Sequence, residues 1–222
     1  GINDAGLSIA LAYGGRQETG RGFGITTILR YVLETCETVP QALRVLQRVP
    51  SHMPYNVVVA DASGAGASVE MYAGGGAKVQ PRLVATNHQT DGSTPDRGSF
   101  TRTFERSKHL VSVLSEGVTP SALAGQFTQA PLKQDRYAEG FGTLFTAEYE
   151  PKRRKMTLHW DDEVWPQSID AFEEGTRQVT YGSAPSSVAA GGAIDWVQIG
   201  LDYAAGRGVD WRRFVPAGGD VA

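Results

Sequence analysis

Cys36 is the only thiol in the chain, and thiol chemistry is the first chemistry to consider. It ends an apolar stripe that runs along residues 25–36 at helical spacing. Glu34 and Glu37 flank it, and nearby carboxylates disfavour a thiolate. A reactive thiol needs partial exposure and a positive or basic neighbour. We therefore interpret Cys36 as a buried structural cysteine, with an unrelated hydrolase that uses Cys36 as the weaker alternative.

The other groups that could do proton or metal chemistry are the four histidines His52, His88, His109 and His159. None stands in a His-Glu-x-x-His pair, so no zinc site is predicted. The chain also lacks a Gly-x-Ser-x-Gly nucleophile elbow. His88 is the one of interest, because it follows a predicted short strand at a loop entrance, where functional groups are often placed.

Asn87 precedes His88 at the carboxyl end of the same predicted strand, residues 83–85. A side-chain amide there can point into a cleft and donate an N–H to an oxyanion, and one such donor is worth about 3 kcal/mol of barrier. The alternative is a turn asparagine that satisfies the local backbone.

Arg102 and Arg106 lie one turn apart on a predicted helix and would share one face. Two interpretations are open. The arginines could pair with Asp96 and Glu105 on the surface. They could instead bind an anionic substrate group, because a guanidinium matches a carboxylate with two parallel hydrogen bonds.

The elements that must position these groups are groups of strands separated by pairs of helices. Thr38 and Gln41 form a capping box at the start of the second helix, and Thr119-Pro120 starts another helix. Predicted strands cover residues 7–13, 55–60, 67–72, 83–85, 141–149 and 156–160, and predicted helices cover 25–36, 38–49 and 100–114. Helices grouped between groups of strands indicate an α+β fold built as a layered sandwich.

Composition excludes several classes of function. The 222 residues hold 24 acidic and 21 basic side chains, so no broad basic face for nucleic acid is expected. The basic run at residues 151–155 is interpreted as a solvated turn. No run of about 18 apolar residues occurs, and no signal peptide is visible. We therefore expect a cytoplasmic protein with neither a nucleic-acid nor a membrane partner.

Several segments together resemble the N-terminal-nucleophile (Ntn) hydrolases related to penicillin acyltransferase, a group that includes the choloylglycine (bile-salt) hydrolases. The first is Gly1–Leu7, which is similar to their G-x-N-x-x-G-L turn, and a later one is Ala85–His88, which carries their T-N-H signature. The other matching segments, in order, are Leu29–Glu34, Thr38–Leu43, Asn56–Asp61 with Gly64 and Val69-Glu70, Ser99–Arg102, and Thr143–Phe145 with Leu158.

The resemblance implies a four-layer αββα sandwich over residues 1–160, followed by a C-terminal extension, residues 161–222. Within that extension we predict a flexible linker at 183–192 and a short helix near 194–204. The implied activity is on amide bonds or acyl thioesters of small molecules, without a cofactor or a metal. The implied nucleophile is a cysteine freed at the mature N-terminus by self-cleavage, with its own α-amino group as the base.

Two residues match site positions of that family, and two more are expected near them. Asn87 takes the place of the asparagine that forms the oxyanion hole, and Arg102 that of the arginine near the substrate or nucleophile. Tyr13 and His88 are expected to line the pocket. Bile-salt hydrolases have an asparagine where this chain has Tyr13, which argues against bile-salt specificity.

One departure from the family pattern decides the interpretation. The catalytic cysteine should precede the G-x-N-x-x-G-L turn, whereas that turn begins here at Gly1, which has no side chain. We expect the sandwich to be incomplete at its N-terminus, with an unpaired sheet edge. The nucleophile would then lie on an upstream segment or separate subunit. The alternative is a non-catalytic binding or assembly module, and homo-oligomerisation is left open.

Overall fold

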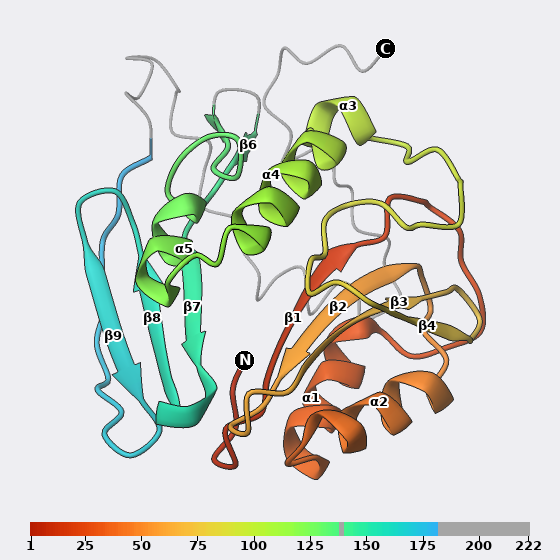
Figure 1. Cartoon of the computed structure of the whole chain (residues 1–222), viewed down its shortest axis with the longest axis horizontal. Helices are drawn as coiled ribbons and strands as arrows, with labels where there is room; N and C mark the ends of the chain where they lie inside the picture. The colour runs from red at the N-terminus through yellow and green to blue at the C-terminus, as the bar shows by residue number, and fades with distance from the viewer. Residues whose placement is uncertain (138–139, 182–222) are drawn as a thin grey trace, which may run out of the picture. The chain divides into compact units, whose positions relative to one another are not determined.

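The computed structural model describes residues 1–137 and 140–181, and the chain divides into two compact units, Gly1–Val179 and Thr180–Ala222. All the helices and strands described below belong to the first unit (Figure 1). The linker predicted at 183–192 and the helix predicted at 194–204 lie outside the described residues.

A four-stranded antiparallel sheet forms the first half of this unit, with its strands in the order of the chain. The strands are β1 (Ser8–Tyr13), β2 (Tyr55–Ala60), β3 (Gly66–Met71) and β4 (Ala77–Gln80). In the register, Asn56 on β2 stands opposite Ala12 on β1 and Glu70 on β3. Since side chains alternate between the two faces of a strand, these polar residues share one face of the sheet.

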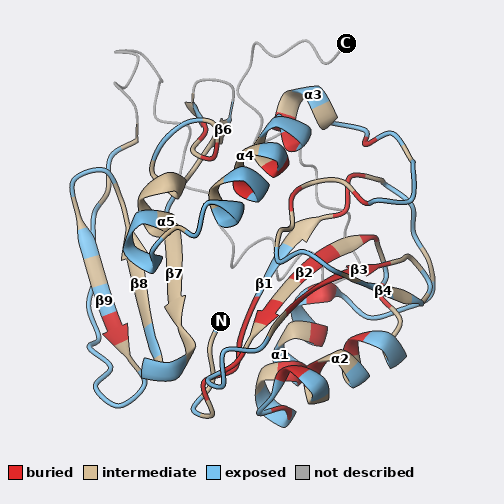
Figure 2. Cartoon of the chain, viewed as in Figure 1, coloured by how far each residue is buried: buried red, intermediate tan, exposed pale blue. Residues whose placement is uncertain are grey.

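Two amphipathic helices, α1 (Ile25–Thr35) and α2 (Val39–Arg48), cover the other face of this sheet. Figure 2 shows buried residues concentrated on β2, β3 and the sheet-facing sides of both helices. The core combines the sheet's aliphatic side chains with those of the helices: Leu7, Ile9, Val57, Val59, Val69, Met71, Ile28, Val32, Val39, Ala42 and Leu46. The predicted helical stripe is thereby confirmed, and burial of this apolar surface stabilises the layer.

The G-x-N-x-x-G-L turn joins this layer to the end of α1. The Asn3 side-chain amide donates to the carbonyls of Leu33 and Cys36, at 2.9 and 2.7 Å, while its Oδ1 accepts from Leu7 N at 2.8 Å. Gly6 has φ +78°, a conformation that favours glycine, and a Cβ there would meet the carbonyl oxygen of Pro151. This motif therefore has a structural role, in which it caps a helix and turns the chain into β1.

Three short helices follow, α3 (Gly98–Thr101), α4 (Thr103–Ser115) and α5 (Pro120–Phe127). The sequence predicts one helix over 100–114, but the structure breaks it at Arg102, whose φ of 51° is left-handed. The predicted start of the next helix is confirmed, because the Thr119 hydroxyl accepts from Ala122 N at 3.4 Å.

A second antiparallel sheet, in the order β7-β8-β9, follows α5 in the chain. Its strands are β7 (Thr146–Glu150), β8 (Lys155–His159) and β9 (Val164–Ser168), and a two-stranded ribbon of β5 (Asp135–Arg136) and β6 (Phe141–Gly142) precedes them. The basic run is a turn, as predicted, and begins with the 3₁₀ helix Pro151–Arg153. The sequence analysis places the end of the core at 160, but β9 lies beyond that point and pairs along β8.

Two predicted strands differ from the structure. The strand predicted over 141–149 is divided into β6 and β7, with residues 143–145 between them. Residues 83–85 form no strand, and the fourth strand of the first sheet is β4, which pairs with β3 from Met71↔Ala77 to Ser68↔Gln80. The glycine turn at 74–76 reverses the chain directly into β4, so the next apolar residues cross the sheet face as a loop.

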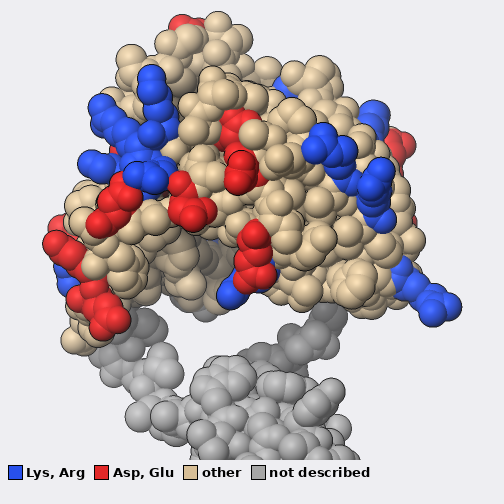
Figure 3. All heavy atoms as spheres, turned by 90° about the horizontal axis from the view of Figure 1, so that it is seen from below, with Lys and Arg blue, Asp and Glu red and all other residues tan. Residues whose placement is uncertain are grey.

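Charged side chains are interspersed on the surface rather than separated by sign. Figure 3 shows both signs mixed on one face of the molecule. In the second sheet, for example, Arg153 pairs with Glu150 at 3.1 Å and Arg154 with Asp170 at 2.6 Å. None of the described helices is both long and apolar enough to cross a membrane.

Candidate active site

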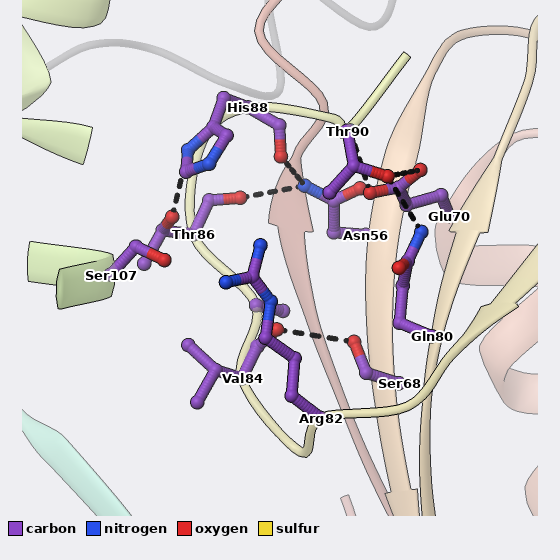
Figure 4. A pocket seen from close by; sticks show the side chains of 11 residues that line it. Asn56, Ser68, Glu70, Gln80, Arg82, Val84, Thr86, His88, Thr90 and Ser107 are labelled. Carbon is purple, nitrogen blue, oxygen red and sulfur yellow. Dashed lines mark hydrogen bonds between the residues drawn. The ribbon is translucent and has the colours of Figure 1, made fainter. Parts of the chain in front are cut away.

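The polar face of the first sheet is buried, which is unusual for polar side chains without a role. Asn56, Ser68 and Glu70 are each at most 4% exposed. The loop that follows β4 crosses this face and covers them, as the close view in Figure 4 shows. Between loop and sheet lies a small polar cavity of about 10 Å³, lined also by Arg82 and His88. The sheet therefore holds this loop through hydrogen bonds instead of apolar packing.

Asn56 is the central anchor of the loop. Its side-chain amide donates to the carbonyl oxygens of Thr86 and His88, both at 2.7 Å (Figure 4). These two carbonyls bracket Asn87, so the backbone on either side of Asn87 is fixed to β2. A buried carbonyl oxygen that lost its hydrogen-bond donor would destabilise the protein by its full desolvation penalty. These two hydrogen bonds therefore hold the loop firmly.

Two further anchors hold the residues after His88. The Gln89 side chain donates to the carbonyl oxygen of Met71 at 2.9 Å. The carboxylate of Glu70 accepts from Thr90 N at 2.8 Å and from the Thr90 hydroxyl at 3.1 Å. The loop over 86–90 is therefore attached to β2 and β3 at almost every residue.

The Asn87 side chain points away from these anchors, towards β1 and α4. Its Nδ2 donates to the carbonyl oxygen of Tyr13, the last residue of β1, at 3.3 Å. Its Oδ1 accepts from Arg106 Nη1 at 3.1 Å. An amide whose oxygen receives a guanidinium N–H is polarised, so its own N–H groups become better donors.

Arg106 is the arginine that reaches Asn87. Burial lowers the pKa of its guanidinium, and its Nε is buried without a hydrogen-bond partner among the described residues. Arg102, by contrast, lies exposed at the break between α3 and α4. It pairs with Glu105 through two hydrogen bonds of 2.8 and 2.6 Å, which raise the pKa of its guanidinium. The two arginines therefore do not act together on one helix face.

Tyr13 and His88 are neighbours of Asn87 through the backbone, because the Tyr13 carbonyl accepts from Asn87 Nδ2 and His88 follows Asn87 in the chain. The Tyr13 hydroxyl donates to Asp96 at 3.0 Å; burial, and then this bond, raise its pKa to about 12. The His88 ring contacts the Thr103 hydroxyl through Nδ1 at 2.8 Å. Burial, and then the positive charge of Arg82, lower the pKa of His88. Both side chains therefore favour their neutral forms at pH 7.

Cys36 stands apart from this network. It is 4% exposed and belongs to the apolar core between the sheet and the two helices, on the opposite face from Asn56. The prediction that it is a buried structural cysteine is confirmed. Nor do the described residues contain a group of three or more histidine, cysteine, aspartate or glutamate side chains placed to hold a metal ion.

The structure thus places Asn87 beside the carbonyl of Tyr13, with His88 next to it in the sheet-anchored loop. Arg102 pairs with Glu105 instead. Asn56 was not among the predicted site residues, and the resemblance assigned the arginine role to Arg102, whereas Arg106 is the arginine that contacts Asn87. A period-two pattern of Asn56 and Val58 on β2 against Ser68 and Glu70 on β3 was the available signal. This pattern indicates a second, polar face of the sheet, opposite the apolar face. Polar side chains on such a face need hydrogen-bond partners when they are buried.

Comparison with known proteins agrees with this architecture. The family model of acyl-coenzyme A:6-aminopenicillanic acid acyl-transferase matches residues 1–165, which include the first sheet, the loop around Asn87, α4 and most of the second sheet. A search of curated proteins found no match to the chain.

Proposed function

The chain belongs to the acyl-coenzyme A:6-aminopenicillanic acid acyl-transferase family, and on that premise we propose that it is part of a cysteine Ntn amidohydrolase or acyltransferase. The proposal includes the four-layer αββα arrangement that this superfamily implies. The observation that carries it is the position of the Asn87 amide, which Arg106 polarises and the sheet-anchored loop holds in place.

In the proposed reaction, a cysteine thiol loses its proton to the adjacent α-amino group, and its sulfur attacks the substrate carbonyl carbon. The C–S bond forms, and the carbonyl π electrons move onto oxygen. An N–H of Asn87 stabilises that oxyanion. The C–N bond then breaks, the ammonium returns the proton to the departing amine, and an acyl thioester remains. Water or an acceptor amine then attacks the thioester carbonyl and gives a proton to the α-amino group. The C–S bond breaks, the sulfur takes that proton back, and the acyl product is released.

The roles of the neighbouring residues follow from their contacts. Arg106 keeps the amide oxygen of Asn87 occupied, so that the amide presents its N–H groups to the substrate. Tyr13 and His88, as neutral polar groups beside Asn87, line the substrate pocket. Arg102 forms an ion pair with Glu105. In this proposal Arg106 therefore takes the role that the resemblance assigns to Arg102.

The attacking sulfur is proposed to come from a segment or subunit outside these 222 residues. The only thiol, Cys36, is buried in the core on the far side of the sheet. Intact-mass analysis and N-terminal sequencing of the native protein test this part. We expect a cysteine-led segment, joined to this chain or co-purifying with it. A native protein without one would leave the second candidate, a non-catalytic binding module, which the burial of the only thiol favours.

Asn87→Ala in the complete enzyme tests the oxyanion role. We expect kcat to fall about 10²–10³-fold, because one donor to the oxyanion is lost. The variant should still fold cooperatively, since the anchors of the loop to β2 and β3 do not involve the Asn87 side chain. A decrease of less than fivefold in kcat would remove Asn87 from this role.

A further inference from the structure

A cavity of about 460 Å³ lies between α5 and β7, and Arg106 of α4 reaches it. This volume falls in the range of small-molecule sites. Most of its wall is apolar, formed by Pro120, Leu123, Ala124, Phe127, Leu132 and Phe145. Arg106 therefore contacts Asn87 with one part of its guanidinium and lines this cavity as well.

The walls of the cavity are apolar but incompletely packed. No residue of α5 is buried, and all five residues of β7 are only half-buried. Hydrogen bonds nevertheless fix the walls in place. His109 on α4 contacts Gln126 on α5 at 2.9 Å, and the Thr146 hydroxyl of β7 donates to the Phe127 carbonyl at 3.3 Å. These hydrogen bonds hold the walls apart, so the cavity stays open and its apolar surface is available to a hydrocarbon ligand.

The charge balance at the Arg106 end calls for a negative or carbonyl oxygen. Among the described residues, Arg106 bonds to the neutral Asn87 amide, and its buried Nε has no partner. Glu148 also lines the cavity, and its carboxylate has a hydrogen-bond contact with His159 Nε2 at 3.0 Å. A partly buried guanidinium without an anionic partner carries a desolvation cost that a bound oxygen anion would offset.

We infer that this cavity holds the acyl group of the substrate, with an apolar hydrocarbon chain between α5 and β7 and the carbonyl end at Arg106 and Asn87. The inference rests on the proposed function and adds the class of acyl group, an apolar aliphatic one. After hydrolysis the released carboxylate lies at Arg106 while its chain fills the cavity. A free aliphatic carboxylate is therefore a ligand for this chain by itself, without any nucleophile.

Calorimetric titration of the full 222-residue chain with butanoate, hexanoate and octanoate tests the apolar part. We expect the affinity to rise about fourfold per added methylene, the value for complete burial of one methylene. Octanamide, which has the same chain without the charge, should bind at least tenfold more weakly than octanoate. An affinity independent of chain length would overturn the inference, as would a failure of octanoate to bind.

A matched pair of variants on α5 tests the place. Ala124 lines the cavity, whereas Ala122, two residues away, is exposed and does not. Ala124→Trp should fill the space and reduce octanoate affinity at least tenfold, and Ala122→Trp should leave it within twofold. Equal affinities in the two variants would place the ligand elsewhere.

Arg106→Met tests the charged end and supplies a second variant should Ala124→Trp fail to fold, which thermal unfolding will reveal. It should abolish the preference for octanoate over octanamide, and a preserved preference would contradict the role of Arg106. These titrations involve no turnover. They can therefore fail while Asn87→Ala still lowers kcat, or succeed while the complete protein proves inactive, so the two proposals are separable.

Discussion

Asn56 fixes the position of Asn87 without touching its side chain. Its side-chain amide donates to the carbonyls of Thr86 and His88, the residues before and after Asn87. The oxygen of the same amide is buried and has no hydrogen-bond partner among the described residues. Such a residue acts on the site through the backbone, so its loss should affect stability and catalytic geometry together.

Asn56→Ala should lower the free energy of unfolding by at least about 2 kcal/mol, because two buried carbonyls lose their donor at about 1–3 kcal/mol each. Urea unfolding followed by circular dichroism measures this. The control is Gln47→Ala, on the exposed side of α2, which should change the free energy of unfolding by less than about 0.5 kcal/mol. If the two variants were equally stable, the anchoring by Asn56 would be refuted.

At this scale the sequence predicts which residues are polar and near a strand end, but not which atoms meet. Asn87 and His88 were selected because a polar pair follows a predicted strand, and the role expected of Asn87 came from the family resemblance. The resemblance assigned the arginine role to Arg102. The sequence does not show that Arg106 contacts Asn87 instead, because this depends on one left-handed residue that breaks the helix. That break turns Arg102 towards Glu105 and leaves Arg106 facing the loop.

Among the elements, the first turn of α2 is stabilised by a side chain that is distant in the sequence. Asp61 follows β2, is 5% exposed, and accepts from Val39 N, the first residue of α2, at 2.8 Å. Burial would raise the pKa of Asp61, but hydrogen bonds from Ser63, Val39 and Ala65 together lower it below its usual value. The carboxylate therefore joins the turn between two strands to the positive end of a helix.

Asp61→Ala should lower the free energy of unfolding at pH 7 by about 1–3 kcal/mol, because Val39 N loses a buried acceptor. The pH dependence has a definite sign. Because the folded-state pKa is depressed, the stabilisation is present above the unfolded-state pKa of about 3.9 and is lost as pH falls through the lower folded-state value. Thermal melts between pH 2 and 7 should therefore show the gap between wild type and variant closing in acid.

Glu37→Ala is the matched control, an exposed acidic residue just before the same helix. It should change stability by less than about 0.5 kcal/mol, because an exposed charge is screened by solvent. An Asp61→Ala gap that stayed constant down to pH 2 would mean that the stabilisation does not depend on the carboxylate's charge.

Apart from β4, the strands and helices of the first layer were predictable, because each has a clear period and a clear end. The capping box of Thr38 and Gln41 is present, with Gln41 Oε1 accepting from Thr38 N at 3.3 Å. Later elements were harder. β9 contains Pro166, which reads as a strand breaker, and it is tolerated because β9 is an edge strand that pairs only with β8. No local pattern distinguishes that situation from a loop.

For the whole molecule, the first compact unit extends to Val179, past residue 160 where the predicted core ends. A chain that ends at Val179 keeps all three strands of the second sheet. A chain that ends at Trp160 loses β9 and leaves the edge of β8 unpaired. Unpaired edges present hydrogen-bonding groups to other chains and promote aggregation.

We therefore expect the chain truncated after Val179 to unfold cooperatively and to elute as a single species in size-exclusion chromatography. The chain truncated after Trp160 should melt at a lower temperature and form aggregates. The full 222-residue chain is the reference for both. Indistinguishable melting temperatures for the two truncations would show that β9 adds nothing to the stability of the unit.

The loop over residues 86–90 is held in position mainly by side chains of the sheet beneath it, and less by its own side chains. Asn56 and Glu70 hold it by backbone atoms, which every residue type except proline supplies in full. Its outward side chains can consequently be exchanged during evolution or by design while the main chain stays in register. Specificity and scaffold are thus encoded in different parts of the chain, and a library that varies the loop should leave β2 and β3 untouched.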